Sequence, residues 1–288
     1  MKNYQLIFFA LIALLILTSC TKESDSKETR EQLPVTKNSQ PIVLVPGTNG
    51  TANDFDDFIA DVSKIYDYQP EILRLTVNED NSLSYSDEPL KKNAYRPFIV
   101  IAFENATEDG TLEQSQRLKT ALMSLEKKYS FKNFDAVGYS NGGLVLTHFL
   151  KHDANTTKIK LRRMVTLATP YNYLSMDENG QEKKVTPLPF HNELLTELLT
   201  DDDSIPQNIS YLNITGDIDS DHGSDSVVPV NSALAGRLIY QDKIKSYKEQ
   251  IFSGKQYSHS GIVNATASEK QSCRSYTETK NKTVELRK

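Results

Sequence analysis

The sequence has few of the features that mark a disulfide-stabilised or strongly basic protein. Among its 288 residues there are two cysteines, Cys20 and Cys273, and no tryptophan. Two cysteines are too few for the disulfide framework of a small secreted domain. The net charge is −5, and the densest basic pairs, at 127–128 and 162–163, fit the ends of regular elements. The composition therefore disfavours nucleic-acid binding and gives no support for strong attraction to anionic lipid.

A hydrophobic run long enough to span a bilayer is also missing at the N-terminus. The stretch from Leu6 to Leu17 is unbroken but short, since a membrane span needs about 20 residues. It follows Lys2 and ends in Leu17-Thr18-Ser19-Cys20, an arrangement typical of a signal peptide. The small residues before Cys20 resemble the bacterial lipobox, in which the cysteine is lipidated. We predict a lipoprotein signal peptide over 1–19, with a plain signal peptide as the alternative.

The rest of the chain divides by composition into a stem, one domain and a tail. Residues 21–40 carry almost no apolar side chains, so this segment is expected to be disordered. We predict a lipid-anchored stem over 20–40, one folded domain over 41–270 and a polar tail over 271–288. The lipid on Cys20 would hold the domain at the extracytoplasmic face of the cell membrane.

Apolar runs alternate with helical patterns along the domain. The expected strands are 42–45, 72–77, 98–103, 134–139, 164–168, 209–214 and 247–253. The expected helices are 54–66, 111–129, 144–150, 191–200 and 232–240, and residues 78–95 and 171–189 are irregular in pattern. This alternation predicts an α/β fold with a mostly parallel central sheet and helices on both faces. Active sites in such sheets lie beyond the carboxyl ends of the strands.

A serine stands at one of these strand ends, in Gly138-Tyr139-Ser140-Asn141-Gly142. A G-x-S-x-G sequence between a strand and a helix is typical of a nucleophile elbow, a strained turn that exposes the serine hydroxyl. The glycines make room for the turn, because a Cβ at either position would collide with the neighbouring strand or helix. We therefore predict that Ser140 is a catalytic nucleophile.

A serine nucleophile needs a base, and the base needs an acid to orient it. In proteins with this elbow the acid and then the histidine follow the serine along the chain. Of the five histidines, His148 and His152 lie too early, on the helix after the serine, and His222 precedes the best acid candidate. His259 follows every acid candidate, in a loop after a strand. We predict that His259 is the base.

The acid belongs to a cluster that follows the strand at 209–214. We predict Asp225, whose Asp-x-x-Val-Pro context sets a carboxylate on a loop above an apolar pair, with Asp217 as the alternative. Such a cluster of carboxylates also suggests a calcium-binding loop. An EF-hand loop needs Gly at its sixth position and Glu at its twelfth, where this chain has His222 and Val228. We expect no metal site and no cofactor.

An acyl-transfer site also needs N–H donors for the oxyanion of the tetrahedral intermediate. One donor is expected from Asn141, the residue after the serine. The second is expected from the loop Pro46-Gly47-Thr48-Asn49-Gly50, where glycine lets the backbone approach a substrate carbonyl. Thr48 is the candidate in that loop, and a simple Pro-Gly turn is the alternative interpretation.

These stretches together resemble the α/β-hydrolase superfamily over nearly all of residues 41–265. More narrowly, the chain is similar to a family of exported or membrane-bound hydrolases of Gram-positive bacteria. The resemblance rests on residues 46–51, 138–143, 225–233 and 259–260. Many members of that family have His-Gly where this chain has Pro46-Gly47, and some lipases share the Pro-Gly-Thr sequence. The resemblance implies an α/β-hydrolase fold and esterase- or lipase-like hydrolysis, and it names no substrate.

The sequence thus predicts a serine hydrolase that cleaves a small-molecule or lipid ester through an acyl-enzyme. It predicts membrane attachment through the N-terminal lipid, no nucleic-acid partner and no obligate protein partner. Two alternatives stay open. The same triad would serve an acyltransferase or an amide hydrolase, and the scaffold would also serve a non-catalytic surface binding protein, because fold does not fix function. The presence of Ser140, Asp225 and His259 weighs against the binding protein.

A segment from Tyr171 to Pro206 interrupts the strand–helix rhythm, and we expect it to form a small cap over the active site. Its apolar side chains are Tyr171, Tyr173, Leu174, Leu188, Phe190, Leu194, Leu195 and Leu198. We expect Leu194, Leu195 and Leu198 to pack on the domain. The others are expected to line an acyl pocket, because ester sites need apolar walls beside a few polar groups.

Overall fold

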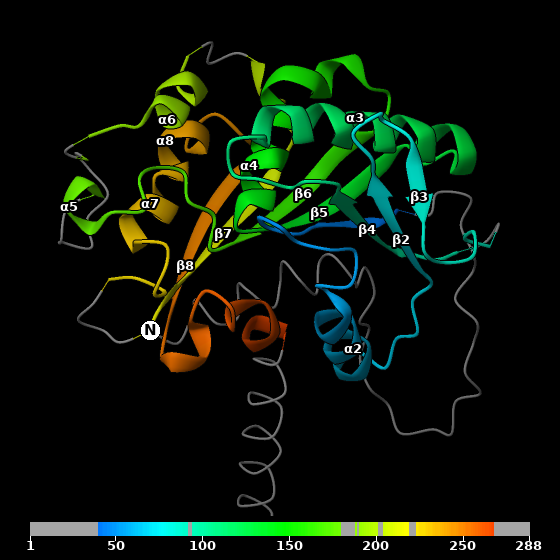
Figure 1. The fold of residues 1–288 in the computed structure, drawn as a ribbon, viewed down its shortest axis with the longest axis horizontal. Helices are drawn as coiled ribbons and strands as arrows, with labels where there is room; N and C mark the ends of the chain where they lie inside the picture. The colour runs from blue at the N-terminus through cyan, green and yellow to red at the C-terminus, as the bar shows by residue number, and fades with distance from the viewer. Residues whose placement is uncertain are drawn as a thin grey trace, which may run out of the picture.

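The computed structural model describes residues 40–91, 94–179, 188, 190–200, 204–218 and 223–267. The predicted signal peptide, Cys20, most of the stem and the C-terminal tail lie outside these residues. The described chain forms an eight-stranded sheet in the order β3-β2-β4-β1-β5-β6-β7-β8 (Figure 1). The strands are β1 (Ile42–Val45), β2 (Ile72–Val77), β3 (Leu83–Tyr85), β4 (Phe98–Phe103), β5 (Asn133–Tyr139), β6 (Lys160–Leu167), β7 (Ser210–Asp217) and β8 (Ser246–Ser253).

Every neighbouring pair in the sheet is parallel except β2 and β3. The helices are α2 (Asp56–Ile65), α3 (Thr111–Tyr129), α4 (Asn141–His148), α5 (Met176–Asn179), α6 (Glu193–Leu198), α7 (Val230–Leu234) and α8 (Gly236–Tyr240). Short helical turns of other types are η1 (Phe149–Asp153, a π-helical turn), η2 (Ala154–Thr156) and η4 (Lys255–Tyr257). Among the described residues, none of the helices combines the length and the apolar character that crossing a membrane requires.

Helices cover both faces of the sheet. Figure 1 shows α3 and α4 on one face, and α2 with the helix at 262–267 on the other. Strand β1 shows the consequence: Val43 and Val45 belong to the core under α3 and α4, whereas Ile42 and Leu44 pack with α2. A strand buried on both faces is a continuous apolar run, which is why the sequence pattern predicted it. The predicted α/β architecture is confirmed.

The structure differs from the predicted elements mainly where polar residues interrupt the apolar pattern from which the elements were predicted. β3 lies within the stretch 78–95 that was expected to be irregular, because it is a short, largely exposed edge strand. β6 begins at Lys160 and not at Met164, and its first half carries Arg162 and Arg163, which lie close to the buried Asp135 carboxylate. The helix expected at 232–240 consists of α7 and α8.

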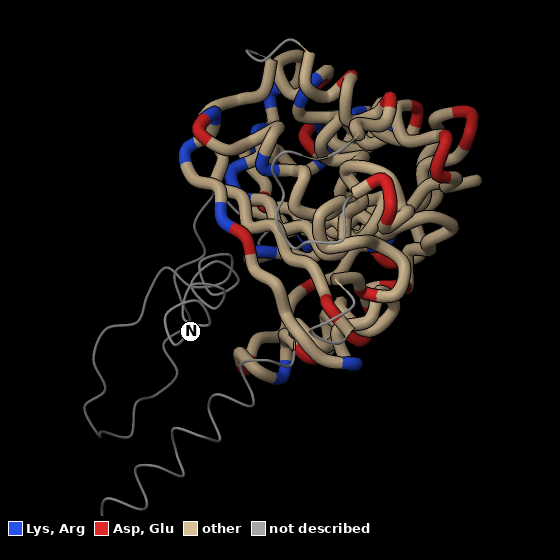
Figure 2. The backbone as a smooth tube through the Cα atoms, turned by 90° about the vertical axis from the view of Figure 1, so that its left-hand side faces the viewer, with Lys and Arg blue, Asp and Glu red and all other residues tan. Residues whose placement is uncertain are grey.

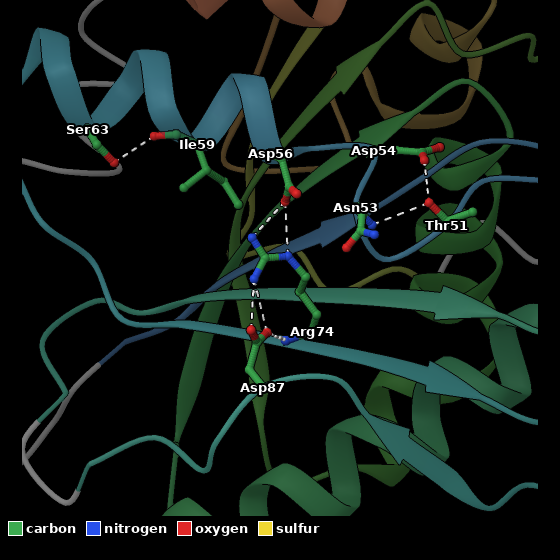
Figure 3. Close-up of polar contacts among 8 residues, drawn as sticks. All are labelled: Thr51, Asn53, Asp54, Asp56, Ile59, Ser63, Arg74 and Asp87. Atoms are coloured by element: carbon green, nitrogen blue, oxygen red, sulfur yellow. Dashed lines mark hydrogen bonds and ion pairs between the residues drawn. The ribbon is translucent and has the colours of Figure 1, made fainter.

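An arginine on β2 connects α2 to the sheet (Figure 3). The Arg74 guanidinium donates to Asp56 Oδ1 at 2.7 Å and to Asp87 Oδ1 at 2.9 Å. Asp56 is the first residue of α2, and in the loop before it Thr51 Oγ1 donates to Asp54 Oδ1 at 2.6 Å. These contacts fix the connection from β1 to α2, which carries Thr48.

Charges of both signs occur over the described surface. Figure 2 shows Lys and Arg positions on several elements, with Asp and Glu positions among them.

Candidate active site

Ser140 lies in the sharp turn between β5 and α4. Its φ is 52°, a left-handed conformation that non-glycine residues rarely adopt. The turn is held by hydrogen bonds from Ser140 N–H to Leu167 O at 2.8 Å and from Gly143 N–H to Ser140 O at 3.0 Å. Since β5 is parallel to its neighbours, the turn stands at the carboxyl edge of the sheet. This geometry is that of the predicted elbow.

The glycines of the motif are required by close packing. A Cβ on Gly142 would lie 2.2 Å from Val45 O, and a Cβ on Gly138 would lie 2.7 Å from Gly143 Cα. Both contacts are with backbone atoms, which side-chain rotation cannot relieve. The G-x-S-x-G spacing therefore follows from how tightly α4 packs against β1 and β5.

The imidazole of His259 lies between Ser140 and Asp225. Nε2 is 3.0 Å from Ser140 Oγ, and Nδ1 is 2.8 Å from Asp225 Oδ2. The loop after β8 and η4 is fastened by a hydrogen bond from His259 N–H to Asp225 O at 2.7 Å. The structure thus brings together three side chains that the sequence separates by up to 119 positions.

Asp225 is completely buried, and its carboxylate is stabilised by hydrogen bonds from protein donors. Oδ1 accepts hydrogen bonds from the amides of Val227 at 2.9 Å and Val228 at 2.6 Å. The alternative acid, Asp217, does not fill this position. Its Oδ1 accepts from the amide of Gly223 at 3.2 Å, so that it supports the loop leading to Asp225. The other acidic candidates, Asp219 and Asp221, lie outside the described residues.

Tyr139 is a further site residue that sequence reasoning missed. Its hydroxyl donates to His259 O at 2.9 Å, and the two rings lie 5.2 Å apart. Burial raises the pKa of Tyr139 to about 12, with a smaller contribution from the Asp225 and Asp54 carboxylates, so the phenol remains a donor. Its place directly before Ser140 was visible in the motif, but its contact with a residue 120 positions away was not.

The two residues expected to bind an oxyanion flank Ser140 at the cleft. Thr48 and Asn141 both line it. Asn141 is the first residue of α4, where backbone N–H groups have no partner within the helix. In the loop after β1, Asn49 N–H donates to Ala106 O and Gly50 N–H to Gly47 O, and no backbone bond among the described residues uses the Thr48 amide. The side chain of Asn141 accepts from Thr111 Oγ1 at 2.9 Å, on the protein side of the turn.

A cleft of about 860 Å³ opens above Ser140 and His259. This volume suits a small organic ligand. Its wall includes the apolar side chains of Leu112, Leu144, Tyr173, Leu174, Leu194 and Val227. Leu112, Leu174 and Val227 remain 45–47 % exposed, so the mouth of the cleft is apolar and accessible.

The segment from Tyr171 to Pro206 contributes to the cleft less uniformly than expected. Tyr173 and Leu174 line the cleft, and so does Leu194, which was expected only to pack on the domain. Three assignments to the acyl pocket were wrong: Tyr171, Phe190 and Leu188. Tyr171 is fully buried, with its hydroxyl 2.7 Å from Tyr211 Oη, because its ring faces the core. Phe190 is 60 % exposed and is not among the residues lining the cleft.

The remaining apolar residues of this segment lie in the core. Leu195 and Leu198 are buried there, as expected. Leu188 was expected in the pocket wall but is also a core residue. Outside the Ser140 group, His148, His152 and Glu197 form a cluster with ligand atoms suited to a metal ion.

Residues 29–273 match the model of a family described as "Alpha/beta hydrolase of unknown function (DUF915)". The chain belongs to this family. The α/β-hydrolase fold and the resemblance predicted from the sequence are thereby confirmed. No curated protein matches this α/β hydrolase in sequence.

Two solved structures are similar to this α/β hydrolase. A gene product of Listeria innocua is 29 % identical, with a TM-score of 0.75, over 82 % of this chain and 92 % of that chain. A protein of Lactobacillus plantarum WCFS1, described as a candidate cell surface hydrolase, is 30 % identical, with a TM-score of 0.66, over 80 % of this chain and 91 % of that chain. Both support the same fold over about four fifths of the chain.

Proposed function

We propose that this α/β hydrolase cleaves carboxylic esters through an acyl-enzyme on Ser140. The observation that carries the proposal is the position of His259, with Nε2 3.0 Å from Ser140 Oγ and Nδ1 2.8 Å from Asp225 Oδ2. When Nδ1 donates its proton to the buried carboxylate, Nε2 is left as an acceptor for the serine proton. In this arrangement His259 acts as general base and Asp225 holds the imidazole in the productive tautomer.

The reaction proceeds in two displacements. Ser140 Oγ attacks the ester carbonyl carbon while His259 Nε2 takes the hydroxyl proton, and the carbonyl oxygen becomes an oxyanion. The amides of Thr48 and Asn141 are the proposed donors to that oxygen, each worth about 3 kcal/mol by analogy with other oxyanion holes. The imidazolium then protonates the departing alkoxide, which leaves as an alcohol. Water, deprotonated by His259, attacks the acyl-enzyme and releases the acid and Ser140.

The cleft supports an ester with an apolar acyl or alcohol group as the substrate. Leu112, Leu174 and Val227 surround its mouth with apolar surface. Burying such surface is favourable by about 25 cal/mol per Å². Polar groups that line the cleft, Thr48 among them, would orient the ester itself.

We further propose that a lipid on Cys20 anchors the enzyme to the extracytoplasmic face of the cell membrane. The support is the sequence Leu17-Thr18-Ser19-Cys20 after an apolar run, together with the cell surface description of the Lactobacillus relative. The polar residues 21–40 would then act as a spacer between membrane and domain.

A panel of p-nitrophenyl esters with graded acyl length tests the proposed activity. We expect hydrolysis to acid and alcohol, with kcat/KM lowered at least about a thousandfold in Ser140→Ala. Ser260→Ala, an exposed serine beside His259, is the matched control and should retain activity. Products formed mainly with added alcohols or amines would identify an acyltransferase, and amide cleavage without ester cleavage would identify an amide hydrolase. If no turnover depends on Ser140, the non-catalytic surface binding protein becomes the favoured interpretation.

A further inference from the structure

Two histidines and a glutamate meet beside the cleft, apart from the Ser140 group. His148 ends α4, His152 follows in the π-helical turn η1, and Glu197 lies on α6. Their ligand atoms all lie within 4.8 Å of one another. The spacing of four residues sets the two imidazoles on one side of the helical segment, where their rings stack at 5.7 Å. Turns of the π type inside helices are frequent at functional sites.

Two atoms of this cluster lack hydrogen-bond partners. His148 Nδ1 and Glu197 Oε2 are buried and, within the described part of the chain, neither forms a hydrogen bond. They face each other at 3.9 Å, which is too long for a hydrogen bond. On the other side of the carboxylate, His152 Nε2 lies 3.0 Å from Glu197 Oε1. Unsatisfied buried polar atoms are rare in folded proteins, and a pair of them that face each other is suited to binding an ion.

The position of Glu197 beside the histidines is fixed by Lys151. The Lys151 ammonium donates to Glu197 O at 2.9 Å and to Leu198 O at 3.0 Å, and also contacts Thr200 O. These bonds fasten the C-terminal end of α6 to η1 through carbonyl groups. They leave the Glu197 carboxylate to face His148 and His152.

The chemistry of the three ligands fits a borderline divalent metal ion. Imidazole nitrogen with one carboxylate suits Zn²⁺, whereas Ca²⁺ and Mg²⁺ prefer oxygen ligands only. Tetrahedral Zn²⁺ with bonds of about 2.1 Å sets its ligand atoms about 3.4 Å apart. The separations of 3.0 and 3.9 Å lie on either side of this value. Rotation of the partly exposed His152 and Glu197 side chains would close the remaining gap.

The protonation state of the buried histidine is also suitable. Burial lowers the pKa of His148 to about 4, and the opposing attraction of the Glu197 carboxylate is the smaller effect. His148 is therefore neutral at neutral pH, as a metal-binding imidazole must be.

We propose that His148, His152 and Glu197 form a Zn²⁺ site. No metal was expected from the sequence, because Glu197 is remote along the chain from the histidine pair. Three protein ligands leave the fourth tetrahedral position to water or an anion. The ion would connect α4 and η1 to α6, whose first residues, Glu193 and Leu194, line the cleft together with His148. It would fix this wall of the cleft without taking part in the Ser140 chemistry.

Zinc titration of the tag-free, EDTA-treated full chain tests the site. Isothermal titration calorimetry should find one Zn²⁺ bound per chain, and this binding should depend on His148, His152 and Glu197. Zinc at about 100 times its Kd should raise the Tm of the protein by about 5–10 °C. His152→Ala and Glu197→Gln should each weaken binding at least about tenfold. Their metal-free Tm should stay within about 2 °C of the wild-type value, because the exchanged side chains are partly exposed.

The matched control is His191→Ala, which removes an exposed histidine just before α6 and should bind zinc as the wild type does. Co²⁺ should give a visible absorption band that His152→Ala abolishes. The proposal is overturned if the full chain binds no zinc, if both ligand variants bind with wild-type affinity, or if His191→Ala removes the same binding. None of these measurements depends on ester hydrolysis.

Discussion

Ser140 is held in a sparsely populated backbone conformation that costs about 1–3 kcal/mol for a residue with a side chain. The surrounding structure stabilises it, because Leu167 O accepts from its amide and Thr169 Oγ1 donates to its carbonyl at 3.1 Å. Strain of this kind is concentrated at functional sites. The positive φ, together with the hydrogen-bonding distance to His259, is a physical reason to assign Ser140 the role of nucleophile.

The choice of acid can be tested by comparing two buried aspartates. Asp225→Asn should lower kcat/KM for a p-nitrophenyl ester by about 10⁴, because an amide opposite Nδ1 favours the wrong imidazole tautomer. Asp217→Asn should retain most activity, since an asparagine oxygen can still accept from the Gly223 amide. Thermal unfolding of both variants serves as the control for folding. The reverse ranking of activities would assign the acid to Asp217.

Local sequence was sufficient to propose Ser140, His259 and Asp225, because the elbow has its own motif and chain order limits the other two. It was not sufficient for Tyr139, whose hydroxyl contacts His259 O, or for the cluster at His148. Those contacts arise only when the loop after η4 lies beside the end of β5 and when α6 lies beside the end of α4, and nothing in the local pattern specifies that packing.

At the scale of elements, burial on both faces made the central strands predictable. β1 and β4 are uninterrupted apolar runs, whereas β3 is a short, largely exposed edge strand with no such signal. The segment after β6 was the least predictable part. Its apolar residues divide between core and cleft according to tertiary packing, so Tyr171 is in the core while Leu174 lines the cleft.

The cleft wall can be tested with two exposed apolar residues of this segment. Leu174→Ala should lower the preference for octanoyl over butanoyl esters about fivefold, the effect of about 1 kcal/mol of lost apolar contact. Phe190→Ala is the matched control: its ring is 60 % exposed and outside the cleft lining, so the preference should not change. Both variants should unfold within about 1 °C of the wild type. If Leu174→Ala and Phe190→Ala change the acyl-length preference equally, or if Leu174→Ala does not change it, this wall of the cleft does not contact the acyl group.

At the scale of the whole molecule, the folded domain and the predicted anchor are separate features. The described residues account for the fold and the cleft, and the family match begins at residue 29, after Cys20. The proposed attachment to the membrane therefore rests on the N-terminal sequence and on none of the described residues.

Substitution of Cys20 tests that attachment. The wild-type protein expressed in a Gram-positive host should partition into the detergent phase and carry the mass of a diacylglyceryl group on Cys20. Cys20→Ser should lose the lipid and impair processing, while Cys273→Ser, the matched control, should not. A mature mass and partitioning that are the same in wild type and Cys20→Ser would reject the lipid anchor.

Labelling with a fluorophosphonate tests the central claim, that Ser140 is a nucleophile activated by His259. Such a probe forms a stable bond only with an activated serine hydroxyl, and it reports on the site without knowledge of the substrate. We predict stoichiometric labelling, a single modified peptide containing Ser140, and loss of labelling in Ser140→Ala and His259→Ala but not in Ser260→Ala. A folded protein that remains unlabelled, or that is labelled equally after Ser140→Ala, would contradict the account.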